Sequence, residues 1–364
     1  MVERQQITSA AAIARLAVDL MRIPSPTGHE SAIVGFTEDL LRAHHVHAER
    51  QEVTPGRFNL IIPPAAGRGG YIVGHLDTIP FRASDYDDIY VSDSIVRGPG
   101  AVDMKGPLAA LLAALFDLSA NPGVKLRPDI GVAFTVGEEE LGDGAAAFLD
   151  EYVPQWAVLT EATNLSICNG SWGCATLDIQ AHGLRAHAMN PQLGRSAVPI
   201  ITEALHRLFA YCHSGQQPFL VNVSKLRSEE CGYSLLPVCE AGVDITLPPG
   251  VEWGPAKDEL FELLRADGTG GALEVNESFF APAFTLPDDA APILEIRRAL
   301  LAAGLPAQLT MFPGPSDANL LHQAGVAAVL FGPGDPAWAH RRGERVSPPD
   351  LAVAARAYKA LMTE

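Results

Sequence analysis

Histidine and aspartate follow a short apolar run near residue 71 of this 364-residue sequence. His75 and Asp77 come directly after the run Tyr71–Gly74, and alternation along an extended chain points both side chains to the same face. A histidine that binds a metal usually has a carboxylate partner that orients its ring, so Asp77 is a candidate partner of His75. An aspartate that caps a turn beside a surface histidine would give the same pattern.

A second acidic residue, Asp103, lies in the glycine-rich segment 97–106, which leads into a helical pattern. The glycine spacing matches neither of the common phosphate-binding motifs. An acidic residue at the centre of such a loop would repel phosphate and attract cations. Asp103 is therefore a candidate metal ligand.

Three adjacent glutamates, Glu138 to Glu140, follow the apolar run 130–136. Carboxylates at a buried strand end repel one another, and a bound cation would compensate their charge. Neighbouring side chains point apart, so one glutamate can bind metal while another faces substrate as a general base. The alternative interpretation is a solvated acidic turn.

Glu161 and His340 complete the set, because each follows another predicted strand. Ligands bind at the C-terminal ends of strands in open α/β sheets, which is where all these groups lie. Two histidines and at least three carboxylates favour Zn²⁺, Co²⁺ or Mn²⁺ over a thiolate or Ca²⁺ site, and the carboxylates suffice for two ions. Two ions about 3.5–4 Å apart can activate water and polarise a carbonyl, as amide hydrolysis requires.

The elements that must position these groups follow two patterns. Residues 1–175 and 283–364 alternate strand-length apolar runs with helical patterns, which predicts an α/β domain with a mostly parallel sheet and helices on both faces. Residues 176–282 instead follow a β-α-β-β-α-β order, typical of a compact α+β, ferredoxin-like module. We expect this module to be inserted into the α/β domain.

The composition excludes several classes of partner. Lys and Arg total 26 against 43 Asp and Glu, and a net charge of −17 argues against nucleic acid or an anionic membrane. The longest apolar stretch, 107–116, is far shorter than the roughly 20 residues that cross a bilayer. The N-terminus reads as an amphipathic helix rather than a signal peptide, and 5 cysteines without CxxC spacing are typical of reduced thiols. We therefore expect a cytoplasmic protein.

Taken together, the motifs resemble the co-catalytic zinc amidohydrolases and peptidases, which include acetylornithine deacetylase, succinyl-diaminopimelate desuccinylase, aminoacylases and glutamate carboxypeptidases. The resemblance covers nearly the whole chain. It rests on GHLDTIP (74–80), RGPGAVDMKG (97–106), TVGEEE (135–140), Glu161, GLRAHA (183–188), PSDANLL (315–321) and GPGDPAWAH (332–340).

This resemblance implies a metal-binding hydrolase of amino-acid biosynthesis that cleaves the amide bond of an N-acyl amino acid, as a deacetylase of the acetylornithine type does. The alternatives on the same site are an exopeptidase or dipeptidase, a metallopeptidase that acts on short peptides, and a hydrolase that releases an amino acid from a carrier protein. A homologue that binds metal without catalysis is a further alternative.

The resemblance also implies two metal ions, zinc or else cobalt or manganese, with Asp103 bridging them. Each ion would be held by Asp103 and two more ligands, His75 and Glu161 on one ion and Glu139 and His340 on the other.

Three further residues receive catalytic roles from the resemblance. Asp77 would brace His75, and Glu138 would carry a proton from the bridging water to the leaving nitrogen. His187 would reach the site of a neighbouring subunit and stabilise the oxyanion. The segment 176–282 would then be a lid and dimerisation domain, and the protein a homodimer.

Four positions depart from the family pattern. Ala162 stands where proline often follows the metal-binding glutamate. Gly137 stands where the family commonly has aspartate, Thr246 where it usually has an arginine for a substrate carboxylate, and Ser234 where asparagine is usual. A hydroxyl cannot replace the planar fork of a guanidinium. Another cation must take over, or the substrate lacks that carboxylate, and we expect no strong preference for succinyl over acetyl substrates. The candidate cations are Arg195, Lys225, Arg227 and Arg341.

Overall fold

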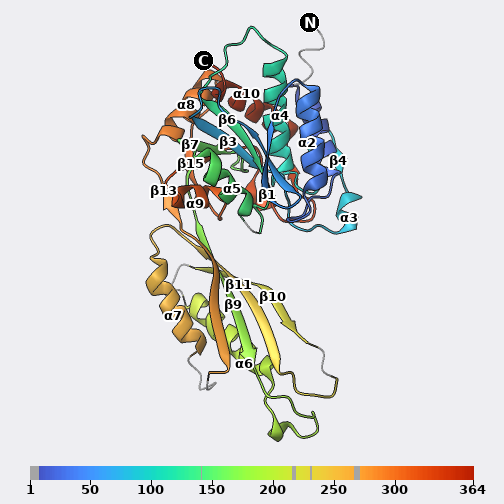
Figure 1. The fold of residues 1–364 in the computed structure, drawn as a ribbon, viewed down its shortest axis with the longest axis vertical. Helices are drawn as coiled ribbons and strands as arrows, with labels where there is room; N and C mark the ends of the chain where they lie inside the picture. Colours follow the sequence, from blue (N-terminus) through green and yellow to red (C-terminus); the bar gives the residue numbers. More distant parts are fainter. Residues whose placement is uncertain (1–7, 141, 215–218, 230–231, 266–270) are drawn as a thin grey trace. The chain divides into compact units, whose positions relative to one another are not determined.

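The computed structural model describes residues 8–140, 142–214, 219–229, 232–265 and 271–364 (Figure 1). The chain divides into two compact units. The first comprises residues 1–170, 286–312 and 316–364, and the second comprises 171–285 and 313–315.

Helices of the first unit form two packed groups. Helices α1, α4 and α10 contact one another and α8 contacts α10, whereas α5 contacts α9 and the strands β1, β2 and β6. No helix in the described residues is long and apolar enough to span a membrane. The helices are α1 (Ala10–Met21), α2 (Ser31–Ala43), α3 (Ala83–Tyr86), α4 (Lys105–Ser119), α5 (Asp143–Tyr152), α8 (Ala291–Ala302), α9 (Asp317–Gln323) and α10 (Pro348–Leu361), with a 3₁₀ turn at Pro336–Trp338.

A nine-stranded mixed sheet has the order β1-β2-β6-β3-β7-β15-β8-β13, and β14 pairs with β8. Its strands belong to the first unit, except β13 and the last residue of β8. A smaller sheet has the order β16-β5-β4. The strands are β1 (Glu49–Thr54), β2 (Arg57–Ile62), β3 (Gly70–His75), β4 (Tyr90–Val91), β5 (Val96–Arg97), β6 (Ile130–Thr135), β7 (Trp156–Leu159), β8 (Ile167–Ser171), β13 (Phe284–Thr285), β14 (Leu309–Phe312), β15 (Ala327–Leu330) and β16 (Arg345–Val346).

The centre of the large sheet is parallel, as the sequence predicts. Strand β3 runs parallel to β6 and β7, and β7 runs parallel to β15. Every residue of β3 is buried, which is typical of a strand covered by helices on both faces. At the edge, β1 and β2 form an antiparallel hairpin that pairs antiparallel with β6.

The second unit is an antiparallel sheet of the order β10-β11-β9-β12 with two helices. Burial alternates along β9, because one face of the sheet is covered by α6 and α7. The β-α-β-β-α-β order is that predicted from the sequence. Its elements are β9 (Gly173–His182), a 3₁₀ turn at Pro191–Leu193, α6 (Ala197–His213), β10 (Leu220–Ser228), β11 (Val238–Leu247), α7 (Trp253–Arg265) and β12 (Leu273–Ala281).

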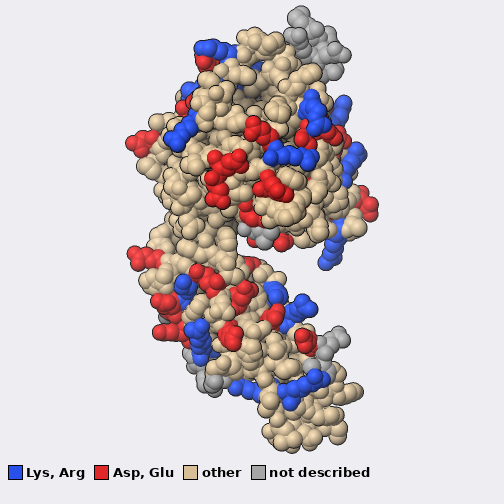
Figure 2. Space-filling view, viewed as in Figure 1, with Lys and Arg blue, Asp and Glu red and all other residues tan. Residues whose placement is uncertain are grey.

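Acidic and basic side chains are interspersed on the face of each unit that Figure 2 shows. No broad basic patch is visible on that face of the described residues.

Candidate metal centre

Parallel pairing brings three of the predicted ligand segments to one edge of the sheet. His75 ends β3 and pairs in register with Thr135 at the end of β6, so the glutamates that follow Thr135 emerge beside His75. On the other side of β3, Val73 pairs with Leu159 at the end of β7, two residues before Glu161. The sheet therefore places these segments side by side because neighbouring parallel strands end at the same edge.

Two loops supply the remaining groups. Asp103 precedes α4, in the turn that begins with Gly98, and His340 lies in the loop after β15. The short pairing of β16 with β5 joins these loops, with Arg345 opposite Arg97. Segments more than two hundred residues apart in the sequence therefore meet at the sheet edge.

The structure brings the five predicted ligands together in two groups that share Asp103. Donor atoms within each group all lie within 4.8 Å of one another. Among the described residues, no other group of at least three metal-binding side chains meets this condition. The groups are His75, Asp103 and Glu161, and Asp103, Glu139 and His340.

Asp103 offers a different oxygen to each group. Its Oδ1 lies 3.0 Å from His75 Nε2, and its Oδ2 lies 3.3 Å from His340 Nε2. Glu161 Oε1 is 3.8 Å from His75 Nε2, and Glu139 Oε2 is 2.9 Å from His340 Nε2. Tetrahedral ligands about 2.0–2.2 Å from a zinc ion lie roughly 3.3–3.6 Å apart. The observed spacings of 2.9–3.8 Å lie within a few tenths of an ångström of this range, close to the separation of the ligands of a divalent ion.

The charges of the groups also fit divalent ions. Burial raises the pKa of Glu161 well above its ordinary value, and the nearby Asp103 carboxylate raises it further. Hydrogen bonds to Asp103 and Glu139 raise the pKa of His340 to about 11. Nearby carboxylates contribute to both shifts, and bound cations would neutralise this negative charge.

The two groups differ in exposure. The His75 side chain is 1% exposed and the Glu161 side chain 5%, whereas the His340 side chain is 50% exposed. The second group is therefore the one that opens to solvent.

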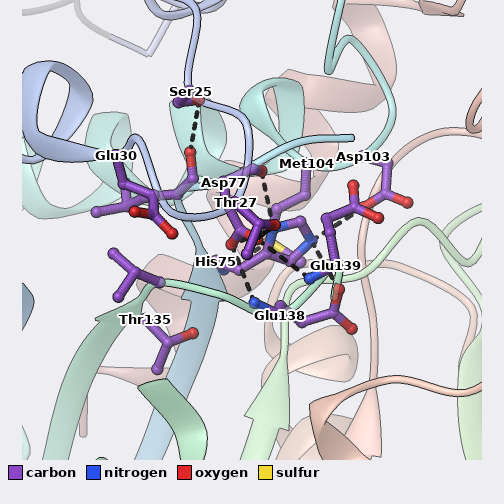
Figure 3. A network of polar contacts seen from close by, with 12 residues as sticks. Ser25, Thr27, Glu30, His75, Asp77, Asp103, Met104, Thr135, Glu138 and Glu139 are labelled. Carbon is purple, nitrogen blue, oxygen red and sulfur yellow. Dashed lines mark hydrogen bonds and ion pairs between the residues drawn. The ribbon is translucent and has the colours of Figure 1, made fainter. Parts of the chain in front are cut away.

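Asp77 holds both the histidine and the two glutamates (Figure 3). His75 Nδ1 lies 3.0 Å from the Asp77 backbone oxygen and 3.5 Å from its Oδ1. The carboxylate accepts hydrogen bonds from the backbone N–H groups of Glu138 and Glu139, each at 3.1 Å, and from the Thr27 hydroxyl at 2.7 Å. This buried carboxylate thus fixes the start of the glutamate loop as well as the imidazole ring.

Glu138 belongs to neither group, although its Oε2 lies 3.8 Å from His75 Nε2. Burial raises the pKa of Glu138 well above its ordinary value. A carboxylate with a raised pKa beside the donor groups is suited to accept and return a proton. Glu140 is exposed and lies outside both groups.

His187 and two of the departing positions lie in the second unit. His187 is exposed, and its Nδ1 accepts a hydrogen bond of 3.1 Å from the Met189 backbone N–H. A neutral His187 ring must therefore carry its proton on Nε2, where it can donate. His187 and Ser234 form an isolated β-bridge, and Thr246 is a residue of β11.

Two of the candidate cations contact nearby groups. Lys225 Nζ lies 3.0 Å from Glu240 Oε2. Arg341 Nη1 donates to the Ala337 backbone oxygen at 3.1 Å, and its guanidinium lies 4.9 Å from the centre of the Trp338 ring. Arg341 adjoins His340 in the sequence, which makes it the candidate cation nearest in sequence to a predicted ligand.

Sequence reasoning missed four acidic groups around the centre. Asp317 accepts a hydrogen bond from Thr135 Oγ1 at 3.4 Å, and burial raises its pKa to about 7. Asp317 is the only one of the four that lies in a motif on which the resemblance rests. The sequence around the other three has no motif that would indicate a role at the site. The other three are Glu30 and Asp143, which both pair with Arg57, and Glu344, which bonds to the loop of Asp103.

Comparison with known proteins connects these features to a family. The model of peptidase family M20/M25/M40 matches residues 71–364. The chain is 29% identical to the succinyl-diaminopimelate desuccinylase of Corynebacterium glutamicum, over 95% of this chain and 94% of that protein. It is 28% identical to a protein of Neosartorya fischeri named as a probable carboxypeptidase, over 94% of this chain and 84% of that protein.

Solved structures share the fold at lower sequence identity. A tripeptidase from Staphylococcus aureus has a TM-score of 0.76 at 18% identity and covers 97% of this chain and 98% of its own. The dipeptidase Dug1p of Saccharomyces cerevisiae has a TM-score of 0.77 at 12% identity, covering 99% of this chain and 97% of its own.

Proposed function

The chain belongs to peptidase family M20/M25/M40 and is a hydrolase, and we propose that it cleaves the amide bond of an N-acyl amino acid with two divalent ions. The observation that carries this proposal is the sharing of Asp103 between two donor groups, with Glu138 beside them. Two bound ions would polarise the substrate carbonyl and activate water for attack. We propose zinc as the metal, with cobalt or manganese as alternatives.

Residues of the chain would then divide the remaining work. His75, Asp103 and Glu161 would hold one ion, and Asp103, Glu139 and His340 the other. Asp77 would keep His75 and the glutamate loop in place through its four polar contacts.

Glu138 would act as the general base and then as the general acid. It would take a proton from the water whose oxygen bonds to the carbonyl carbon. It would return this proton to the nitrogen as the C–N bond breaks, which releases a carboxylic acid and an amine. General acid–base catalysis of this kind contributes about 10²–10⁴-fold to a rate.

We further propose that residues 176–282 are a lid and dimerisation domain of a homodimer in the cytoplasm. His187 would donate from Nε2 to the oxyanion in a neighbouring subunit's site. The exposure of His187 and the engagement of its Nδ1 support this role.

Complementation between two inactive variants tests this arrangement. Light scattering in solution should give the mass of a dimer. His187→Ala protein and Glu138→Gln protein should each be inactive alone and should regain activity when their subunits are mixed, because one site of the mixed dimer then has both residues. A monomer mass, or no recovery after subunit exchange, would refute the proposed role of His187.

The favoured substrate is an amino acid with an uncharged N-acyl group, such as acetylornithine. Thr246 lacks a guanidinium, so a second carboxylate on the acyl group would not be strongly bound there. The desuccinylase relative argues for an acylated amino acid, and the carboxypeptidase relative for a peptide, which is itself an N-acyl amino acid. A carboxypeptidase or dipeptidase activity is therefore the second candidate.

Amine release from a substrate panel tests the proposal. Protein reconstituted with Zn²⁺ or Co²⁺ should hydrolyse acetylornithine or acetyl-lysine faster than dipeptides, with no strong preference for a succinyl substrate. Glu138→Gln should keep its metal and lose about 10²–10⁴-fold in kcat. Glu140→Gln is the matched control, because Glu140 is exposed, and it should retain activity. Absence of turnover on every acylated amine and peptide would refute the proposal.

A further inference from the structure

Glu344 is a buried carboxylate that collects three backbone N–H groups from one loop. It is 1% exposed. Its Oε1 accepts hydrogen bonds from Val102 at 2.6 Å and from Asp103 at 2.7 Å, and its Oε2 accepts one from Gly100 at 3.1 Å. The backbone oxygen of Glu344 accepts a fourth from Gly98 at 3.0 Å. One residue thus closes the whole turn that carries Asp103.

The same residue lies four positions after His340. The backbone N–H of Glu344 donates to the Arg341 oxygen at 3.1 Å, which closes the turn between His340 and Glu344. His340 has a φ of 58°, a left-handed conformation that costs about 1–3 kcal/mol for a residue with a side chain and persists only where neighbours hold it. Glu344 therefore anchors the strained turn of His340 to the turn of Asp103.

These two anchored residues belong to the second, more exposed donor group. His340 Nε2 and Asp103 Oδ2 are 3.3 Å apart, although the two side chains come from different loops. Their separation thus depends on how firmly the backbones of the two loops are joined. The pairing of β16 with β5 supplies two residue pairs beside Glu344, and the Glu344 carboxylate bonds directly to the backbone of Asp103.

A carboxylate is the side chain that these donors require. Three N–H groups converge on two oxygens, and an ionised carboxylate has about four acceptor positions and no hydrogen to repel them. Glutamine has the same shape, but its NH₂ group would face at least one of the three donors. The resulting unsatisfied N–H group would be buried, so the turn must move to relieve it.

Lys105 is a buried side chain beside the same turn. Its Nζ donates to the Ile23 backbone oxygen at 2.6 Å. Burial lowers the pKa of Lys105 to about 7, and the Glu344 carboxylate acts in the opposite direction. A methyl group added at Gly100, where φ is 76°, would lie 3.0 Å from the Lys105 side chain, so the turn has no spare room. The turn, Lys105 and Glu344 therefore form one tightly packed arrangement.

We propose that Glu344 is a positioning residue that sets the spacing of Asp103 and His340 and thereby controls binding of the second ion. This inference rests on the proposed two-ion function. In the first group, His75 ends β3 and Glu161 follows β7, whereas Glu344 holds the loop of Asp103, so the ion of that group should depend less on Glu344. Replacing a residue that orients a metal ligand typically changes the metal affinity 10–100-fold.

Calorimetric titration of metal-free protein with Zn²⁺ tests this inference. Wild type should bind two ions, and Glu344→Gln should bind one with nearly unchanged affinity and the other about 10–100-fold more weakly. Glu344→Asp keeps the charge but is one methylene shorter, so it should show a smaller loss, and it carries the test if Glu344→Gln does not fold. Glu52→Gln, at an exposed glutamate, is the matched control and should bind both ions as wild type does.

The outcomes separate this inference from the proposed function. If wild type binds no pair of ions, both fail. If wild type binds two ions and Glu344→Gln binds both with wild-type affinity, only the inference about Glu344 fails. Equal weakening of both ions, together with a lower urea midpoint of the metal-free variant, would identify a general structural role and also overturn it.

Discussion

Replacing Arg57 with methionine should lower the free energy of unfolding of the first unit by about 3–5 kcal/mol at neutral pH. The Arg57 side chain is 11% exposed and pairs with Glu30, whose side chain is 1% exposed. Their bonds are 3.0 Å from Nε to Oε2 and 2.7 Å from Nη2 to Oε1. Arg57 also forms an ion pair with Asp143, and its Nη2 lies 3.2 Å from Asp143 Oδ1.

The size of this loss depends on the polar contacts and hydration that Glu30 and Asp143 retain when Arg57 is replaced. The Asp143 side chain is 28% exposed and can be hydrated, so its loss is small. Glu30 keeps a bond of 2.9 Å from the Gly28 N–H but remains a buried charge without the Arg57 cation. Removing one partner of a buried ion pair typically costs about 3–5 kcal/mol. Glu30 is the one carboxylate that Arg57→Met would leave buried without its cation.

Urea unfolding monitored by circular dichroism measures this loss of stability. The protein should be metal-free, because release of bound metal would otherwise contribute to the measured free energy of unfolding. The slope of the free energy of unfolding against urea concentration increases with the surface that unfolding exposes, so it distinguishes unfolding of the larger first unit from that of the smaller second unit. Arg42→Met is the matched control, since the Arg42 side chain is 67% exposed, and it should cost less than about 1 kcal/mol.

A double-mutant cycle with Glu30→Gln tests the cause. The stability lost in the double variant should be smaller than the sum of the two single losses by about 1–3 kcal/mol. The reason is that the neutral amide of Glu30→Gln leaves no buried charge when Arg57 is absent. A loss below about 1 kcal/mol for Arg57→Met, or strict additivity in the cycle, would refute this reasoning.

Three further predictions concern other parts of the structure. Gly137→Ala should lower stability by about 1–3 kcal/mol and reduce kcat, because Gly137 has a φ of 78° and an added methyl group would lie 2.1 Å from Asp143 Oδ1; unchanged urea unfolding and kcat would contradict this. Burial raises the pKa of Cys168 to about 12, so the thiol stays protonated at pH 8 and should resist iodoacetamide, and rapid labelling detected by mass spectrometry would be the opposite result. Zn²⁺ at a thousand times its Kd should raise the free energy of unfolding of metal-free protein by about 4 kcal/mol per bound ion, whereas an unchanged urea midpoint would argue against ion binding.

Much of the fold could be predicted because its central elements bury long apolar runs. The runs near 71 and 130 became β3 and β6, and α4 is buried on all sides from Lys105 to Leu118. Hydrophobic periodicity detects such elements directly. The order of elements in the second unit could be predicted for the same reason.

Elements with little apolar surface could not be predicted in this way. Strand β1 has one buried residue, Gln51, and its polar sequence has no strand signal. Strands β4, β5 and β16 have two residues each, too few for any periodicity. Helix α7 begins at Trp253 and has Pro255 in its first turn, where proline is tolerated.

Some residues of the candidate site could likewise be predicted from the sequence, and others could not. His75, Glu139 and Glu161 follow strand ends, where position alone suggests a ligand. Glu344 and Arg57 act through partners that are distant in the sequence, since 241 residues separate Glu344 from Asp103 and 86 separate Arg57 from Asp143. Contacts over such distances depend on the tertiary fold, so no local pattern could reveal them.

Anomalous diffraction from crystals of Zn²⁺-reconstituted protein tests the central claim most directly. The account predicts two peaks about 3.5–4 Å apart, with the two oxygens of Asp103 directed at different peaks and Glu138 bound to neither. A single peak, two peaks that do not share Asp103, or no peak beside His75 and His340 would contradict it.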